Sequence, residues 1–439
     1  MKPCILTLPL EPMEKLYRAL HLDITRQDDR NIWFLILEIF WASILASAAS
    51  FNGAYAVHLG ATNTDIAWLN SIPALLAVIV SFPVGRFLQS RSQLKPWILW
   101  ALTVYRLSYA MMAIIPLVQL AHLSQGTLSV LWLIGWTAPA TFFNVGFTPM
   151  LADVIPEEKR AATFTARNVV LGAAVSAFNF LFGQWLYYIA FPLNYQVMYL
   201  VGVVTSMMSI YYLSRIKVPA AVAPPPAPVK IRLNLPQQIQ VVRRSIRDYP
   251  GFFLIVLNTS LYGIGLWLAQ PLYIIYYVRI LHASDAWIGL QGTVGSLATI
   301  FGYTLFRWIM ARWGVHNTLK RTIITQGLVP VMVALAPSLT LILVAVAFNG
   351  LVASGINLSQ YITLLKLIPE DRRASYSAIY TGLVNIGIFI CPLVGVSLAN
   401  AFGFVPSLIV FGLLSCIGAF SFWLWPVIKE QPDSLAEAG

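Results

Sequence analysis

Three ionisable residues lie inside long apolar stretches of the sequence, and they are the first candidates for chemistry. Glu38, Arg106 and Arg167 each fall about two to three helical turns into such a stretch. If these stretches cross a membrane, each charge is costly and is by default a candidate functional group. Glu38 can pair with Arg106 or with Arg167, which lie at comparable depth. Two roles stay open: a buried ion pair that fixes helix packing, or a carboxylate that carries a coupling proton as a guanidinium approaches and withdraws.

A second set of candidates consists of amides and aromatic residues in the same apolar stretches. An unpartnered amide in hydrocarbon is costly, so these residues are expected either to line an interior site or to bond neighbouring helices, while the aromatic residues can also pack in the core or anchor at the interface. A lining of this kind favours neutral ligands such as sugars or drug-like molecules, and Arg106 and Arg167 leave a monoanionic ligand open. The expected substrate-binding residues are Asn52, Asn144, Asn258, Trp267, Gln270, Gln291, Asn357, Gln360, Tyr380 and Asn385.

The composition indicates which elements hold these residues. Of 439 residues, 58% are hydrophobic and only 10% are charged, against about 25% charged in a typical soluble protein. Apolar runs of roughly 20 residues recur, long enough to cross the hydrocarbon core as helices. The sequence therefore predicts an all-α integral membrane protein. Its twelve helices are expected to begin near Ile32, Ile66, Pro96, Thr127, Ala161, Tyr195, Tyr249, Ala286, Thr322, Thr340, Ser375 and Phe404.

The basic residues are distributed unevenly between the two sides of the predicted membrane. With these helix positions, 25 of the 28 Lys and Arg residues lie on the side that holds the N-terminus, and only Arg279 reaches the opposite side. This asymmetry follows the positive-inside rule and predicts a multi-pass protein with both termini in the cytoplasm. The net charge of +11 is therefore explained by topology, and we expect no nucleic-acid partner.

The sequence offers little for catalysis or for a cofactor. The three cysteines have no metal-ligand spacing, and no phosphate-binding loop or zinc motif is present. We expect no metal, no cofactor and no enzymatic activity. The N-terminal residues lack the pattern of a secretory signal peptide.

The chain divides into five expected segments. Apolar residues at helical spacing between Met13 and Leu20 predict an amphipathic helix on the membrane surface, and Pro-rich sequence followed by a second basic amphipathic stretch occupies the centre. The segments are a cytoplasmic N-terminal segment (1–31), a six-helix bundle (32–215), a cytoplasmic linker (216–248), a second six-helix bundle (249–428) and a cytoplasmic tail (429–439).

Two short phrases occur once in each half of the chain. "LADVIPEEKRA" from Leu151 returns as "LLKLIPEDRRA" from Leu364, with six of eleven positions identical at an offset of 213 residues. "LGATNTDIAWL" from Leu59 returns as "LHASDAWIGLQ" from Leu281 at an offset of 222. The protein is therefore expected to contain two copies of one six-helix unit, facing the same way across the membrane. Asn144 and Asn357 are equivalent at the first offset.

Twelve helices in two like-oriented halves, a long central loop and the repeated "IPE" phrase together resemble the major facilitator superfamily. The resemblance covers about residues 30 to 428 and identifies no subfamily. In "GRFLQSRSQLK" from Gly85, Gln89 stands where the superfamily signature has an aspartate. The resemblance implies two pseudo-symmetric bundles that alternate access to a central site, a small-molecule substrate, a lipid bilayer as surroundings and a monomer. It implies an inner gate, expected at Asp153, Glu157, Arg160, Glu370, Asp371 and Arg373.

The resulting functional hypothesis is a secondary transporter for a small neutral or weakly charged organic solute, either facilitative or proton-coupled. It is expected in the plasma or inner membrane of a cell. Two alternatives stay open: an exporter of drugs or other amphiphiles with the same fold, and a membrane receptor or assembly protein that has lost transport.

Overall fold

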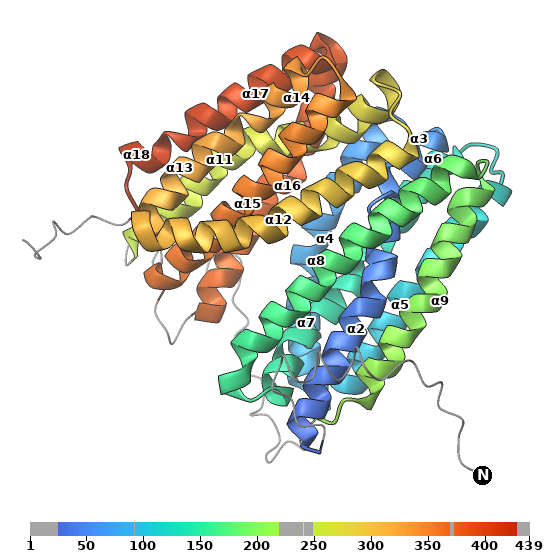
Figure 1. The fold of residues 1–439 in the computed structure, drawn as a ribbon, viewed down its shortest axis with the longest axis vertical. Helices are drawn as coiled ribbons and strands as arrows, with labels where there is room; N and C mark the ends of the chain where they lie inside the picture. Colours follow the sequence, from blue (N-terminus) through green and yellow to red (C-terminus); the bar gives the residue numbers. More distant parts are fainter. Residues whose placement is uncertain (1–24, 92, 219–239, 241–248, 369–372, 428–439) are drawn as a thin grey trace, which may run out of the picture.

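The computed structural model describes residues 25–91, 93–218, 240, 249–368 and 373–427, and these are almost entirely helical. The only non-helical pairing in this part of the chain is an isolated bridge between Leu120 and Leu123. Figure 1 shows two groups of helices, one coloured blue to green and one yellow to red. The predicted surface helix near Met13, most of the central linker and the C-terminal tail lie outside the described residues.

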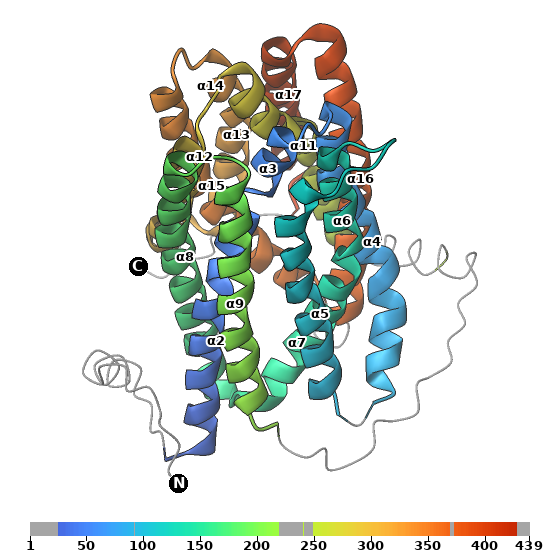
Figure 2. The same cartoon turned by 90° about the vertical axis from the view of Figure 1, so that its right-hand side faces the viewer.

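The described residues of the N-terminal half form eight α-helices, which make six membrane passages. Some passages are interrupted: the first by a turn at Ser50 and Phe51, and the fourth at Trp136. In Figure 2, α2 and α5 run upward from the end at which α2 begins, and α9 runs back down to that end. The helices are α2 (Gln27–Ala49), α3 (Asn52–His58), α4 (Asn63–Gln89), α5 (Lys95–Ile114), α6 (Gln125–Gly135), α7 (Thr137–Val154), α8 (Glu157–Tyr188) and α9 (Leu193–Arg215).

The C-terminal half repeats this plan. Its first helix continues into a π-turn at Tyr276–Ile280. The helices are α11 (Pro250–Ile275), α12 (Asp285–Trp313), α13 (Val315–Gly327), α14 (Val329–Leu335), α15 (Leu339–Leu367), α16 (Arg373–Phe402), α17 (Phe404–Ala419) and α18 (Ser421–Leu424).

Eleven helices in the described residues are long and apolar enough to cross a membrane. The remaining predicted passage, expected from Thr322, consists of the short helices α13 and α14, which are separated at Leu328 just before Pro330. Proline favours a helix start because it lacks an amide donor, so this passage is broken rather than missing. The predicted integral membrane fold of twelve helices in two pseudo-symmetric bundles is confirmed.

The repeated phrase near Leu59 and Leu281 has a local structural cause. The Thr62 side chain accepts a hydrogen bond from the Asp65 amide at the start of α4, and the equivalent Ser284 side chain accepts one from Trp287 at the start of α12. Hydroxyl side chains at this position satisfy an amide that the helix leaves without a partner. The repeat therefore marks the same capped helix start in both halves.

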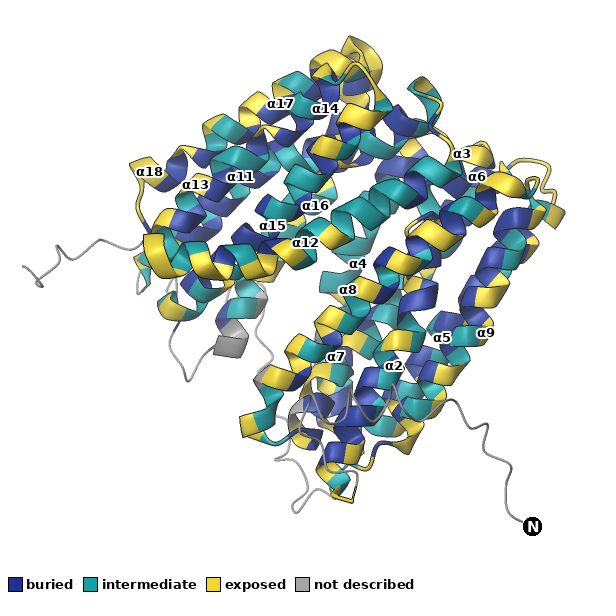
Figure 3. Ribbon diagram, in the orientation of Figure 1, coloured by how far each residue is buried: buried dark blue, intermediate teal, exposed yellow. Residues whose placement is uncertain are grey.

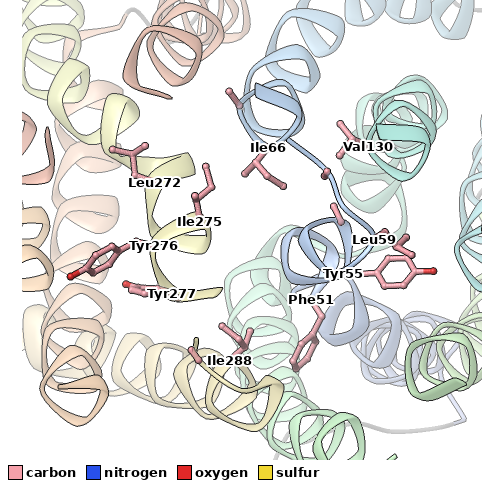
Figure 4. Packing of buried hydrophobic residues seen from close by; sticks show 14 of the residues in the cluster. Phe51, Tyr55, Leu59, Ile66, Val130, Leu272, Ile275, Tyr276, Tyr277 and Ile288 are labelled. Carbon is pink, nitrogen blue, oxygen red and sulfur yellow. The ribbon is translucent and has the colours of Figure 1, made fainter. Parts of the chain in front are cut away.

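Buried apolar residues form one large cluster shared by the two halves and two smaller clusters that each belong to one half. The shared cluster contains Phe51, Tyr55 and Ile66 from the first half and Leu272 and Ile288 from the second. Figure 4 shows residues of this cluster on helices of both halves. We call this end of the molecule, where α3 ends and α4 begins, the closed end.

At the opposite end, where α2 begins, the two halves have separate cores. One cluster, around Ile32 and Leu102, is drawn from the N-terminal half, and the other, around Phe252 and Ile368, from the C-terminal half. The two groups of ribbons diverge towards this end (Figure 1). We call it the open end. Figure 3 colours the exposed positions yellow. Many of the residues exposed on the helices are large and apolar, which suits contact with lipid.

Candidate functional site

A group of polar side chains links the two halves at the closed end. Arg279 donates hydrogen bonds to the Asn63 side-chain oxygen, at 2.5 Å, and to the Ala61 carbonyl. The Asn63 amide in turn donates to Asn400 at 2.8 Å. Arg279 was predicted to be the one basic residue on this side, and the structure shows it bridging from the second half to the first.

Asp285 makes a second connection at the closed end. Its carboxylate accepts a hydrogen bond from the Tyr195 hydroxyl at 2.6 Å and lies 3.2 Å from the His58 ring nitrogen. Both partners belong to the N-terminal half, whereas Asp285 is the first residue of α12. Together with Arg279, Asn63 and Asn400, these residues form what we call the closed-end clasp.

Helices α8 and α12 pass very close to each other between the clasp and the middle of the molecule. A methyl group at Gly289 would lie 2.4 Å from the backbone oxygen of Asn179, so only glycine permits this approach. Thr293 donates to the Ser176 carbonyl at 2.9 Å, and the Ser176 hydroxyl donates to the Thr293 carbonyl at 3.3 Å. The two halves are therefore closely packed against each other from the middle of α8 to the closed end.

Glu38 lies within the N-terminal half and is paired with both candidate arginines. Its carboxylate accepts from Arg167 at 3.0 Å, from Arg106 at 3.5 Å and from the Ser209 hydroxyl at 2.8 Å. The side chain of Glu38 is only 2% exposed. The structure thus brings together the three ionisable residues that the sequence singled out, and it adds Ser209 from α9.

Backbone carbonyls hold the two arginines in place. Arg167 donates to the Leu35 carbonyl at 2.6 Å, and Arg106 donates to the Ser206 carbonyl at 2.8 Å. The cluster therefore ties α2 to α5, α8 and α9. Sequence reasoning missed the serines of α9, although the i, i+3 spacing of Ser206 and Ser209 in an apolar stretch is a weak signal of a polar helix face.

A pocket of about 220 Å³ lies between α2, α5 and α7. Arg106 and Asn144, both expected from the sequence, line it together with Tyr105 and Tyr109. The two tyrosine hydroxyls are 3.4 Å apart. The pocket therefore offers one cation, one amide and two hydroxyls against a wall of alanine, leucine and phenylalanine side chains.

Several predicted binding residues instead hold helices together. Asn52 accepts from Tyr199 at 2.9 Å and donates to Tyr109 at 3.4 Å. Asn258 is fully buried and donates to the Trp425 carbonyl at 3.0 Å.

Gln360 and Tyr380 are also bonded to neighbouring helices. The Gln360 amide donates to Thr259 at 2.8 Å and to the Tyr380 hydroxyl at 2.6 Å. Trp267 packs half-buried against the shared core cluster. A further polar group joins Tyr262 and Asn349 through Gln326.

The remaining predicted binding residues are accessible to different degrees. Asn144, Asn357 and Gln270 are exposed, whereas Gln291 and Asn385 are partly buried. Because an amide facing hydrocarbon is costly, the exposed pair Asn144 and Asn357 is best placed for contact with solute or water.

The predicted inner-gate residues lie at the open end. Asp153 and Glu157 are exposed there, and Arg160 donates to the Ile155 carbonyl at 3.1 Å. Glu370 and Asp371 lie outside the described residues, as does the side chain of Arg373. An ion pair that was not predicted joins Lys159 to Asp29 at 2.5 Å, within the N-terminal half. In the part of the chain that the structure describes, no cluster of His, Cys, Asp or Glu could hold a metal.

Comparison with known protein families finds a match in the C-terminal part of the chain. The family model described as Major Facilitator Superfamily matches residues 255–439. This match covers less than half of the chain, and together with the fold it confirms the predicted resemblance to the major facilitator superfamily, with no subfamily identified. The match and the eleven long apolar helices support an integral multi-pass membrane protein.

Solved structures share the fold over most of the chain. The nucleoside transporter NupG superposes with a TM-score of 0.62 at 13% identity, covering 91% of this chain and 100% of that one. A POT family transporter in complex with 5-aminolevulinic acid gives 0.67 at 13% identity, over 91% and 97% of the two chains. The inward-open xylose transporter XylE from E. coli gives 0.63 at 13% identity, over 92% and 96%. No curated protein sequence matches the chain significantly.

Proposed function

We propose that this protein moves a small neutral or weakly charged organic solute across a membrane by alternating access. The observation that carries the proposal is the distribution of the cores: both halves share one apolar cluster at the closed end and have separate clusters at the open end. Two bundles arranged in this way can rock about their contact and expose a central site to one side at a time.

The open end is proposed to face the cytoplasm. The excess of Lys and Arg on the side of the N-terminus supports this orientation under the positive-inside rule. The described state is then inward-facing, and the closed-end clasp is the outer gate. The two six-helix bundles of residues 32–215 and 249–428 are proposed as the units that move.

The pocket supports a small solute more than a bulky amphiphile. Its volume of about 220 Å³ is below the range of roughly 300–1,000 Å³ that is usual for drug-sized ligands. Its tyrosine hydroxyls and the Asn144 amide suit a ligand with hydroxyl or carbonyl groups, and Phe143 offers an aromatic face. Asn357, the repeat equivalent of Asn144, is proposed to contribute from the other half when the bundles close.

Glu38 is the proposed carrier of a coupling proton, if transport is proton-coupled. Its contacts with both arginines belong to the inward-facing state, and their loss in the other state would change its affinity for a proton. In proteoliposomes, Glu38→Gln should then abolish substrate-driven proton movement while ligand binding persists. Unchanged proton movement in the folded variant would exclude Glu38 as the carrier.

The test of the transport proposal is a ligand screen followed by uptake. Purified protein is screened by thermal shift with neutral sugars, nucleosides, small organic acids and amphiphilic drugs, because a bound ligand stabilises the folded state by mass action. Hits are repeated with Asn144→Ala and then measured for uptake into proteoliposomes. A small polar ligand that is transported, with binding weakened in the variant, supports the proposal. Binding without any uptake favours a receptor, and hits confined to amphiphiles favour an exporter.

A further inference from the structure

The cluster around Glu38 carries more positive than negative charge. Two guanidiniums, those of Arg106 and Arg167, face a single carboxylate, and the exposed fractions of the three side chains are 6%, 8% and 2%. A guanidinium stays protonated under all ordinary conditions. With Glu38 ionised, the cluster therefore has a net charge of +1.

Other acidic groups on the surrounding helices are too distant to balance this charge. On α2 the nearest carboxylate is that of Asp29, which is paired with Lys159. It lies nine residues before Glu38, or about 13 Å along the helix. On α8 the acidic residues are Glu157 and Glu158 in the first turn, both exposed. On α7 the acidic residue is Asp153, which is exposed at the open end. The described residues of α5 and α9 contribute no acidic group.

The unbalanced charge borders the pocket. Arg106 is at once a partner of Glu38 and a lining residue of the pocket, whereas Arg167 is turned towards Leu35 and Glu38. The Arg106 guanidinium uses one nitrogen for the Ser206 carbonyl and one for Glu38. Since a guanidinium has five N–H donors, it can still donate to a ligand.

From this juxtaposition we propose that the transported solute carries one negative charge, a carboxylate on a small organic molecule, and that Arg106 recognises it. The inference rests on the proposed transport function. A monoanion makes the buried cluster neutral, a neutral solute leaves one positive charge uncompensated in a medium of low dielectric, and a dianion reverses the imbalance. Asn144 and Tyr105 are placed to hydrogen-bond the rest of the solute.

The experiment compares matched pairs of acid and amide on purified protein. Lactate, benzoate and nicotinate are tested against lactamide, benzamide and nicotinamide, with thermal shift and then equilibrium binding as readouts at constant ionic strength. At least one carboxylate should bind the wild type more tightly than its amide. A charge-assisted hydrogen bond of ordinary strength corresponds to a preference of about ten- to a hundredfold.

Variants test which residue causes the preference for carboxylates over amides. Arg106→Gln should remove it, Arg106→Lys should retain part of it, and Arg312→Gln should leave it intact, because this exposed arginine lies near the far end of α12. If Arg106→Gln does not fold, Tyr105→Phe serves instead: it keeps the charge, so affinity should fall while the preference for the acid remains.

The outcomes separate this inference from the transport proposal. Amides that bind and are taken up as well as acids overturn the inference but leave transport standing. An acid preference that survives in folded Arg106→Gln also overturns it. A protein that transports no member of the polar solutes screened or of either series overturns both.

Discussion

Replacing Glu38 by glutamine removes the single carboxylate that separates two buried guanidiniums. Glu38 accepts from Arg167, Arg106 and Ser209 and is 2% exposed, so no solvent replaces the lost contacts. Removing one partner of a buried ion pair generally costs about 3–5 kcal/mol. We expect Glu38→Gln to lower the free energy of unfolding by that amount, even though the amide has nearly the same shape.

Arg106→Gln is the matched control, because it leaves one carboxylate with one guanidinium. The hydrogen bond from Arg106 to Glu38, at 3.5 Å, is longer than the one from Arg167. The variant also loses the hydrogen bond from Arg106 to the Ser206 carbonyl. The expected loss is about 1–2 kcal/mol. Both variants are measured by reversible unfolding in mixed micelles. If Glu38→Gln is no more destabilising than Arg106→Gln, the charge count of the cluster is wrong.

Three further predictions concern the contacts between and within the halves. Arg279→Gln should weaken the closed-end clasp by about 1–3 kcal/mol, which spin-label distances across the closed end would report as a larger share of long distances. Gly289→Ala should push α8 and α12 apart and cost about 1–3 kcal/mol, whereas Gly295→Ala, whose added methyl would lie 3.4 Å from its nearest neighbour, should leave thermal stability unchanged. Asn52→Ala should cost about 1–2 kcal/mol in unfolding experiments without altering ligand preference, because Asn52 bonds Tyr109 and Tyr199 but does not itself line the pocket.

Most of the fold could be predicted from the sequence, because the constraints that a bilayer imposes on a chain leave patterns in the order of its residues. The lengths of the apolar runs predict the membrane passages, and the side that carries Lys and Arg predicts the orientation. The phrases repeated from Leu59 and Leu281 predict the two-unit plan, and the structure shows that they mark a capped helix start at Thr62 and Ser284. The passage from Thr322 shows the limit of that reasoning. Its helices, Val315–Gly327 and Val329–Leu335, are individually short, and the break depends on a local proline.

Only the charged residues of the candidate site could be predicted from the sequence. A charge in an apolar stretch must find a partner, so Glu38, Arg106 and Arg167 stood out. The amides of residues such as Asn258 and Gln360 can form hydrogen bonds either to a neighbouring helix or to a ligand. The sequence does not indicate which of the two partners they have. The pocket tyrosine Tyr105 was invisible for the same reason, since its role depends on which helix face packs against which.

The relative movement of the two halves is the central claim, and distances across both ends test it most directly. Spin labels are placed at Glu158 and Arg312 for the open end and at Thr64 and Ala401 for the closed end, all exposed positions, in a variant that lacks the native cysteines. Without ligand, the open-end pair should be far apart and the closed-end pair close. A transported ligand should shift both distributions in opposite directions, with the open-end pair shortening as the closed-end pair lengthens. Distances at the two ends that stay fixed, or that change together, would contradict alternating access.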